Sequence, residues 1–321
     1  MLERIFNVLE ITLPVFAMIG LGRWLTVKNI MTADHRQFIN KLIYHFSLPA
    51  LMFIGIAGTS FDKLVNPPII VGAIAPVLVI IIIAFIITKI LKINPVIQGP
   101  FIYAGFWANA TYMGFPLAER AFGAEGFVNA AIFNAFGVPV WLTAGTIITG
   151  LYGDVKDPTS KLLKNLAANP LLAASILGVL VAFIIQKTTV SNYVAITAPV
   201  SMITSFLKLG GSMGLPLALL AIGGGLSFKA VADDKFPLAI ACSFKVVLTP
   251  LITLLLINYL FPEADKVVVG SCVLLMSMPV AIASYIIATG SHINEGAASA
   301  VVVWTTAASI ITIPAWLYFL I

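Results

Sequence analysis

Long apolar runs alternate with short polar connections along the whole chain. A helix needs about 20 apolar residues to cross the hydrocarbon core of a bilayer. Ten segments meet or approach that length, so the pattern predicts an all-α integral membrane protein with ten transmembrane helices. The predicted helices run roughly over Phe6–Leu25, Phe38–Ala57, Pro68–Leu91, Ile97–Phe122, Phe127–Leu151, Pro170–Gln186, Ala198–Leu226, Phe236–Leu260, Val267–Thr289 and Ala297–Ile321.

The longest polar connection lies between the fifth and sixth predicted helices and runs from Asp154 to Asn169. Within it, Ser160 to Leu166 could form a short interfacial helix. The connection divides the chain into residues 1–153 and 170–321. We predict that each part is one structural unit of five helices.

The two parts share a sequence pattern. Seven of the 21 positions from Lys41 to Phe61 match the positions 167 residues further on, without a gap. The matches are Lys41, Leu42, Leu48, Pro49, Gly58, Ser60 and Phe61 with Lys208, Leu209, Leu215, Pro216, Gly225, Ser227 and Phe228. Because five predicted helices separate the copies, the second must enter the membrane from the opposite face. The pattern thus predicts inverted repeats, which are typical of transporters; coincidence between two hydrophobic helices is the alternative.

The composition supports a membrane protein. Hydrophobic residues make up 60% of the chain and charged residues 10%, whereas a soluble domain has about 45–50% and about 25%. Two cysteines and three histidines leave little material for a disulfide framework or a metal site, and we expect neither metal nor cofactor. The first apolar run contains Glu10 and continues to Arg23 without a cleavage signature, so we expect a retained helix.

The basic residues predict an orientation. The net charge of +5 comes from residues in short segments between apolar runs, which favours an orienting role over a nucleic-acid partner. One set of alternate loops holds eleven: Arg23, Lys28, Arg36, Lys41, Lys89, Lys92, Lys156, Lys161, Lys164, Lys229 and Lys235. The other set holds five: Arg4, Lys63, Arg120, Lys187 and Lys266. We therefore predict a multi-pass cell-membrane protein with a cytoplasmic 154–169 connection and both termini outside.

Two predicted helices carry small and polar residues in mid-span. The fourth contains the stretch from Trp107 to Pro116, and we expect it to break at Gly114 and Pro116, because glycine is permissive and proline lacks an N–H. The ninth contains Ser277-Met278-Pro279, followed by Ser284. Two interrupted helices at matching positions indicate a mid-membrane binding site. The alternative is a pair of proline kinks healed by neighbouring helices.

Such breaks would present unpaired N–H groups and the positive ends of helix dipoles, which favours an anionic ligand such as a carboxylate. Side chains near the breaks add donors and acceptors. The candidate substrate-binding residues are Asn109, Thr111, Tyr112, Gly114, Pro116, Ser277, Pro279 and Ser284.

Two charged residues are candidates for charge compensation or ion coupling. Lys245 lies nine residues after Phe236, about 14 Å into the membrane at 1.5 Å per residue, where an ammonium is costly. It could serve as a counter-charge to the substrate or clamp the carbonyls of a broken helix. Glu119 could bind a proton or sodium, or it could pair with Arg120 or cap the short half-helix.

Several of these segments together resemble the auxin efflux carrier family. They are Pro14, Ile39 to Lys41, Leu48-Pro49, Asn109 to Pro116, Leu215 to Leu219, Ser277 to Ala281, Glu295 to Ala298 and Ile313-Pro314. The resemblance covers nearly the whole chain, and the segment from Ser277 to Ala281 is its most specific part. The chain differs from the usual family pattern at Thr111-Tyr112-Met113, where a stretch rich in glycine and asparagine is common.

This resemblance implies a homodimeric elevator carrier in which broken helices four and nine cross. Helices one, two, six and seven would form the scaffold, and helices three to five and eight to ten the moving transport unit. Plant relatives export indole-3-acetate, and bacterial relatives are linked to malate and malonate. The short central connection is typical of a prokaryotic member.

Taken together, the sequence predicts a secondary active transporter of small organic anions in a lipid bilayer, with a proton or Na⁺ as the candidate coupling ion, and not an enzyme. An intramembrane enzyme would need clustered catalytic groups, which the predicted spans lack. Two alternatives stay open: a sodium-coupled symporter resembling the bile-acid carriers, and a membrane sensor that binds its ligand without moving it.

Overall fold

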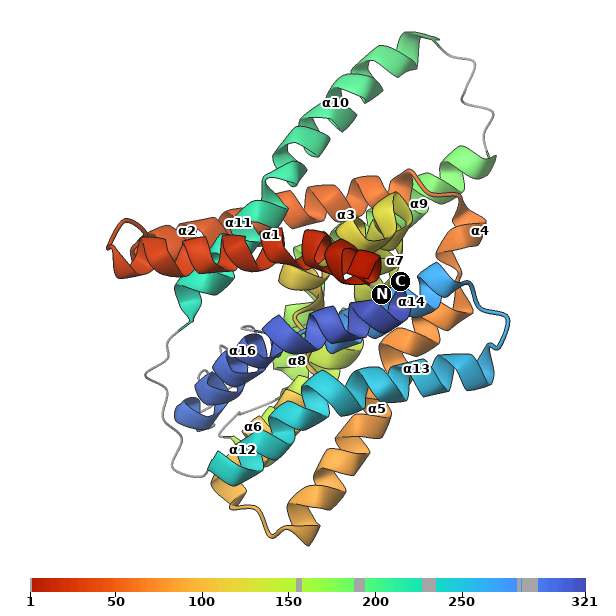
Figure 1. Ribbon diagram of the computed structural model, residues 1–321. Helices are drawn as coiled ribbons and strands as arrows, with labels where there is room; N and C mark the ends of the chain where they lie inside the picture. The colour runs from red at the N-terminus through yellow and green to blue at the C-terminus, as the bar shows by residue number, and fades with distance from the viewer. Residues whose placement is uncertain (1, 154–157, 188–193, 227–234, 282–283, 285–293) are drawn as a thin grey trace.

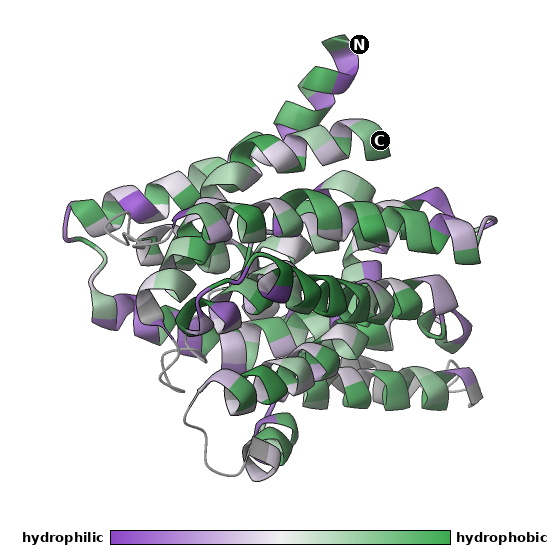
Figure 2. Cartoon of the chain, turned by 90° about the horizontal axis from the view of Figure 1, so that it is seen from below, coloured by the Kyte–Doolittle hydropathy of each residue, from purple (hydrophilic) through white to green (hydrophobic). Residues whose placement is uncertain are grey.

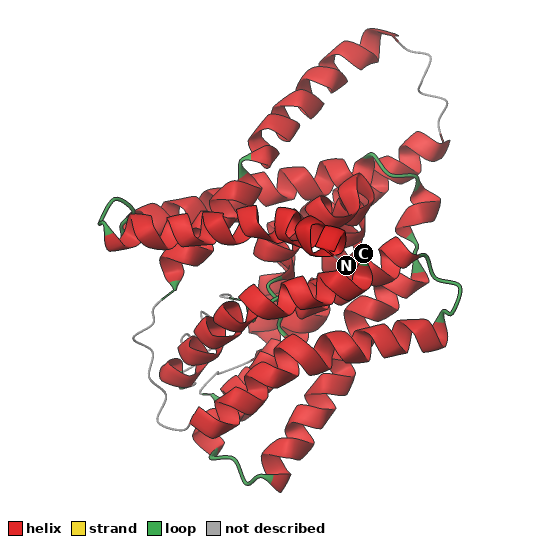
Figure 3. Cartoon of the chain, in the orientation of Figure 1, coloured by secondary structure: helices red, strands yellow, loops and turns green. Residues whose placement is uncertain are grey.

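The computed structural model describes residues 2–153, 158–187, 194–226, 235–281, 284 and 294–321. Within these ranges the chain is helical apart from turns, short connections and one isolated β-bridge (Figure 3). The N and C termini lie on the same side of the molecule (Figures 1 and 2). The predicted all-α class is confirmed.

Seven helical segments among the described residues are long and apolar enough to cross a membrane. They comprise α1 (Leu2–Val27); α2 (Ala33–Leu42) with η1 (Ile43–Ser47) and α3 (Leu48–Ala57); α4 (Phe61–Leu64) with α5 (Pro67–Ile90); η2 (Ala110–Gly114) with α7 (Phe115–Tyr152); α10 (Val194–Ser212) with α11 (Gly214–Gly225); α12 (Lys235–Ser243) with η4 (Phe244–Leu248) and α13 (Thr249–Leu260); and α16 (Glu295–Leu320). The shorter helices are α6 (Pro95–Phe106), α8 (Pro158–Ala167), α9 (Pro170–Lys187) and α14 (Lys266–Ser277). The chain is therefore a multi-pass membrane protein.

The helices consist largely of apolar residues (Figure 2). Leu209, Ile311 and Phe319 are 73%, 75% and 77% exposed. Exposed apolar surface on this scale is incompatible with water and is what a helix bundle presents to lipid.

Three π-helical turns each end two residues before a proline. The turns η1, η2 and η4 precede Pro49, Pro116 and Pro250. A proline cannot donate to the carbonyl four residues earlier, and its ring collides with that carbonyl in a regular α-helix. A wider π turn relieves the collision without ending the helix. These prolines therefore shape the helices locally instead of breaking them.

The helices pack in two groups. In one, α1 packs closely on α11, and α3 packs on α9. A Cβ atom at Gly22 would overlap the carbonyl oxygen of Leu220, and one at Gly223 would overlap that of Ile19. The backbones of α1 and α11 are thus in direct contact, as in small-residue interfaces of membrane helices. In the other group, α5, α7, α13 and α14 pack on one another, together with α6, α12 and α16.

Candidate functional site: the crossing of two interrupted helices

Two twelve-residue helices end in the interior of the second group. They are α6 and α14, and each begins at a capping side chain, Asn94 for α6 and Asp265 for α14. Beyond Phe106 and Ser277 the backbone leaves the helical conformation. The predicted interruption after Ser277 is therefore present, and part of the ninth predicted span (282–283 and 285–293) lies outside the described residues.

The two interrupted segments cross and pair with each other. Ala108 and Val280 form an antiparallel β-bridge. Its hydrogen bonds run from the Asn109 N–H to the Pro279 carbonyl (2.8 Å) and from the Ala281 N–H to the Trp107 carbonyl (3.0 Å). Extended backbone at membrane depth is tolerated only where protein or a wet cavity satisfies it, and here each segment satisfies the other.

The break in the first segment is not where the sequence predicted it. It spans residues 107–109, whereas Gly114 and Pro116 lie in the helical backbone of η2 and α7. Pro116 is the second residue of α7, where the preceding π turn accommodates the missing N–H. Gly114 is needed for packing, because a Cβ there would lie 2.6 Å from Leu275 Cδ2 of α14. The prediction of a break at Gly114 and Pro116 is wrong.

Several backbone N–H groups at the breaks have hydrogen-bond partners within the protein. Besides the two amides of the bridge, the Val280 N–H donates to the hydroxyl of Thr305 on α16 (3.1 Å). Thr305 is fully buried and was missed by the sequence analysis. The amides of Asn109, Val280 and Ala281 are therefore satisfied inside the protein, so these three are not among the unpaired N–H groups expected at the breaks.

The first turn after the break keeps open donors. In the described part of the chain, the N–H groups of Ala110, Thr111 and Tyr112 have no hydrogen-bond partner, as expected at the start of a helix. The side chain of Asn109 precedes them, is 4% exposed and makes no hydrogen bond with any described residue. The carbonyl of Asn109 accepts from both Met113 and Gly114. This turn combines unpaired donors with the positive end of a helix.

Thr111 and Tyr112 point to different partners. The Thr111 hydroxyl donates to the side-chain oxygen of Asn134 on α7 (2.8 Å). Tyr112 is half-buried and packs against the hydrophobic core. The η2 turn also contacts α11. It therefore lies where the two helix groups meet.

The hydroxyl groups of the predicted serines on the second segment donate to backbone carbonyls three residues earlier in the sequence. Ser277 donates to the Leu274 carbonyl and Ser284 to the Ala281 carbonyl, each at 2.7 Å. Both serines and Pro279 are buried. Ser284 lines a small cavity with room for about one water molecule. The other lining residues are Pro100, Tyr103 and Ala104 of α6, Val280, and Ala298 and Val301 of α16.

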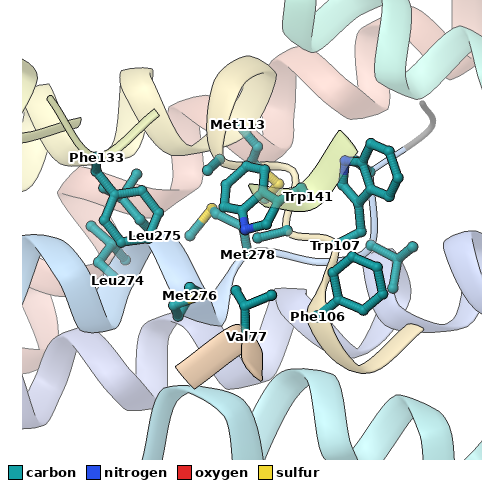
Figure 4. Packing of buried hydrophobic residues seen from close by; sticks show 14 of the residues in the cluster. Val77, Phe106, Trp107, Met113, Phe133, Trp141, Leu274, Leu275, Met276 and Met278 are labelled. Atoms are coloured by element: carbon teal, nitrogen blue, oxygen red, sulfur yellow. The ribbon is translucent and has the colours of Figure 1, made fainter. Parts of the chain in front are cut away.

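Buried aromatic and thioether side chains surround the crossing (Figure 4). Trp107, Met113 and Met278 flank the interrupted backbone. Trp141 of α7 is 2% exposed, and its indole N–H has no partner among the described residues. Neither Trp141 nor Asn134 was predicted from the sequence. The available signal was a polar group in an apolar segment, which is costly in a membrane and marks functional positions.

Lys245 is a residue of η4, and its side chain contacts the C-terminal end of α14. Its ammonium is fully buried and donates to the Met276 carbonyl at 2.9 Å. Carbonyls in the last turn of a helix lack intrahelical partners and carry the negative end of the helix dipole. The carbonyl-clamp geometry considered for Lys245 is therefore observed.

Glu119 is exposed on α7. No ion pair joins it to Arg120 within the described ranges. Arg120 instead donates through Nη2 to the Glu10 carbonyl (2.7 Å) and through Nε to the Ile11 carbonyl (3.0 Å) of α1. The Glu119–Arg120 pair, one of the alternatives considered for Glu119, is not formed, because the guanidinium binds backbone carbonyls of another helix.

A bundle of membrane-spanning helices in which two interrupted helices pair at their breaks, beside a turn of open donors, defines a membrane transporter. The family described as "Membrane transport protein" matches residues 7–317. The chain belongs to this family, the auxin efflux carrier family, as the resemblance indicated. The assignment makes it a transporter and not an enzyme.

Relatives similar to this chain carry transporter names. An uncharacterised transporter of Methanocaldococcus jannaschii is 24% identical over 321 residues, which covers 98% of this chain and 99% of the relative. A Rhizobium meliloti protein named "Putative malonate transporter" is 26% identical over 322 residues, covering 97% and 95%. An uncharacterised transporter of Methanothermobacter thermautotrophicus is 20% identical over 314 residues, covering 96% of each chain.

Proposed function

We propose that this protein is a secondary active transporter of small organic anions and that it binds a substrate carboxylate at the first turn of η2. The unpaired N–H groups of Ala110, Thr111 and Tyr112, together with the Asn109 carboxamide, carry this proposal. A carboxylate accepts several hydrogen bonds at once, and a helix start favours negative charge. The buried indole N–H of Trp141 is a further neutral donor beside the crossing.

Lys245 supplies the compensating charge in this proposal. An anion that enters the membrane interior needs a nearby positive charge to offset its desolvation. The Lys245 ammonium is held by the end of α14, which is the helix that leads into the crossing. Glu119 is not used, since its carboxylate is exposed.

The proposed architecture has ten helices in two inverted five-helix repeats. In support, α6 and α14 have the same length, and both their capping residues and their last residues are 171 positions apart, Asn94 with Asp265 and Phe106 with Ser277. These helices would be the first halves of helices four and nine. Ser227 and Phe228 of the sequence repeat lie outside the described residues.

We further propose an elevator mechanism in a homodimer. The group containing α1, α3, α9 and α11 would be the scaffold, and the group containing the crossing would move against it. The η2 turn lies where the groups meet, so movement of one group would carry a bound anion across the membrane. The apolar outward face of α10, with Met202, Phe206 and Leu209 exposed, is the proposed dimer contact. The protein would lie in the cell membrane (the plasma or inner membrane), and both termini would lie on its outer side.

Malonate and malate are the first substrates to test, because a relative bears a malonate transporter name. The purified protein in proteoliposomes should take up labelled malonate or malate, and Asn109→Leu should abolish uptake without loss of folding. A ligand at 100 times its dissociation constant should also stabilise the protein by about 2.7 kcal/mol. Absence of both binding and flux for all small carboxylates would refute the proposal.

The same experiment separates the alternatives. Binding without flux would identify a sensor. Flux that requires Na⁺ on the side of entry would identify a sodium-coupled symporter, and flux that follows an imposed pH gradient would identify proton coupling.

A further inference from the structure

The side-chain amide of Asn134 has a defined orientation. Asn134 is fully buried on α7, and its Nδ2 donates to the Ala130 carbonyl at 2.8 Å. Because a carbonyl oxygen can only accept, the nitrogen of the amide must lie on that side. The other end, Oδ1, is therefore the acceptor for Thr111, whose Oγ1 lies 2.8 Å away.

In this orientation Thr111 donates its only hydroxyl proton to Asn134 Oδ1. A threonine hydroxyl has one donor and two acceptor lone pairs. With the donor used by Asn134, Thr111 Oγ1 can only accept from any further partner. No donor reaches it from the described residues, and the side chain is half-buried, so its lone pairs are open.

The η2 turn therefore offers two kinds of hydrogen-bonding group side by side. The backbone N–H groups of Ala110 to Tyr112 are donors, and the Thr111 hydroxyl is an acceptor. A ligand with carboxylate oxygens alone would place an oxygen against the Thr111 lone pairs and leave them unsatisfied. A ligand that also carries an O–H or N–H group would satisfy both.

We propose that the site selects small carboxylates that carry a hydrogen-bond donor close to the ionised carboxylate, such as a hydroxyl, an amino group or a second, protonated carboxyl. The inference rests on the proposed binding of a carboxylate at η2 and names the class of acid that is bound. Thr111 is the specificity-determining residue, and Asn134 is a positioning residue that fixes the direction of its proton.

Glycolate and methoxyacetate test the proposal, because they differ in whether the oxygen next to the carboxylate carries a proton. Binding of each to the full-length protein in nanodiscs should be measured by calorimetry at one pH. The wild type should prefer glycolate about tenfold, the effect of one good hydrogen bond. Thr111→Val should weaken glycolate binding about tenfold and leave methoxyacetate unchanged, whereas Thr111→Ser should keep the preference.

Asn134→Leu tests the positioning role through the binding of methoxyacetate, which a purely structural role of Asn134 would not improve. It releases the Thr111 proton, so Thr111 can donate to the ether oxygen, and methoxyacetate binding should improve towards that of glycolate. A uniform loss of both ligands in Asn134→Leu would contradict the assigned positioning role.

The outcomes separate the two proposals. Equal wild-type affinities for the two probes would overturn the selectivity and leave carboxylate binding at η2 intact. Failure of both probes, and of malonate and malate, to bind the wild type would overturn the proposed function as well. Na⁺ that raises the affinity of both probes equally, with the effect lost in Thr111→Val, would assign the Thr111 lone pairs to a cation and overturn the selectivity.

Discussion

The Nζ atom of Lys245 lies 2.9 Å from the carbonyl oxygen of Met276, one residue before α14 ends. The ammonium is fully buried, and no carboxylate pairs with it among the described residues. One hydrogen bond and the helix dipole do not offset the cost of removing an ammonium from water. This imbalance supports the proposed role of Lys245 in anion binding over a role in the stability of the fold.

Lys245→Met should separate these two effects. Loss of the charge should weaken anion binding at least tenfold, while the midpoint of thermal unfolding without ligand should stay the same or rise. Lys208→Met on the exposed face of α10 is the matched control and should change neither quantity. A Lys245→Met protein that unfolds more easily but binds anions normally would assign the lysine to structure alone.

Arg120 performs a different kind of carbonyl capping. Pro14 of α1 has no N–H, so the carbonyl of Glu10 loses its normal donor. Arg120 of α7 supplies one at 2.7 Å. Arg120→Gln should therefore destabilise the protein by about 1 kcal/mol, a small value because the contact is exposed.

The partnership with Pro14 can be tested by a double-mutant cycle. Pro14→Ala restores an N–H that can reach the Glu10 carbonyl within α1. The cost of Arg120→Gln should therefore be smaller in the Pro14→Ala background, when both are measured by thermal unfolding in one detergent. Strict additivity of the two changes would show that Arg120 does not compensate for the proline.

Gly114 is predicted to tolerate no side chain. The Cβ of Gly114→Ala would lie 2.6 Å from Leu275 Cδ2, and Leu275 is fully buried. Overpacking of this kind costs about 1–3 kcal/mol, and we expect transport to fall with it. Leu275→Ala in the same protein should recover part of the loss by making room.

Gly20→Ala is the control for Gly114→Ala. A Cβ at Gly20 meets no atom within 4 Å, and alanine is the better helix former by about 1 kcal/mol. This variant should be neutral or stabilising. Equal behaviour of Gly20→Ala and Gly114→Ala would contradict the close approach of η2 to α14.

The sequence predicted the all-helical class and the existence of two interruptions, because long apolar runs and polar mid-span residues are visible without coordinates. It misplaced the first interruption. The effect of Pro116 is local and is absorbed by the η2 turn, whereas the break at 107–109 depends on pairing with Val280, 172 positions away in the chain. Pairing at such a separation leaves no local signature.

The same limit applies to the site residues. Asn109 was predicted because it is a polar residue in the middle of an apolar span, which is a local feature. Asn134 and Thr305 were missed because their roles come from contacts with Thr111 and with the Val280 amide on other helices. For Lys245, sequence alone left two readings open, and only the contact with Met276 shows which group the ammonium touches.

Thr305 is predicted to hold the crossing together. Its hydroxyl accepts from the Val280 N–H at 3.1 Å and donates to the Val301 carbonyl at 2.7 Å within α16. Thr305→Val keeps the shape of the side chain but leaves the Val280 amide unsatisfied in the membrane interior. The cost should be about 1–3 kcal/mol, seen as a lower thermal midpoint and reduced transport.

Thr306 provides the matched control, because its hydroxyl donates only to the Val302 carbonyl of its own helix. After Thr306→Val, the Val302 carbonyl can still accept the backbone N–H of residue 306 within the helix. This change should therefore cost much less stability than Thr305→Val. Thr305→Ser retains the acceptor and should behave like the wild type. If both valine variants were equally stable and active, the Val280 amide would not depend on Thr305, and the crossing would be held by its two backbone hydrogen bonds alone.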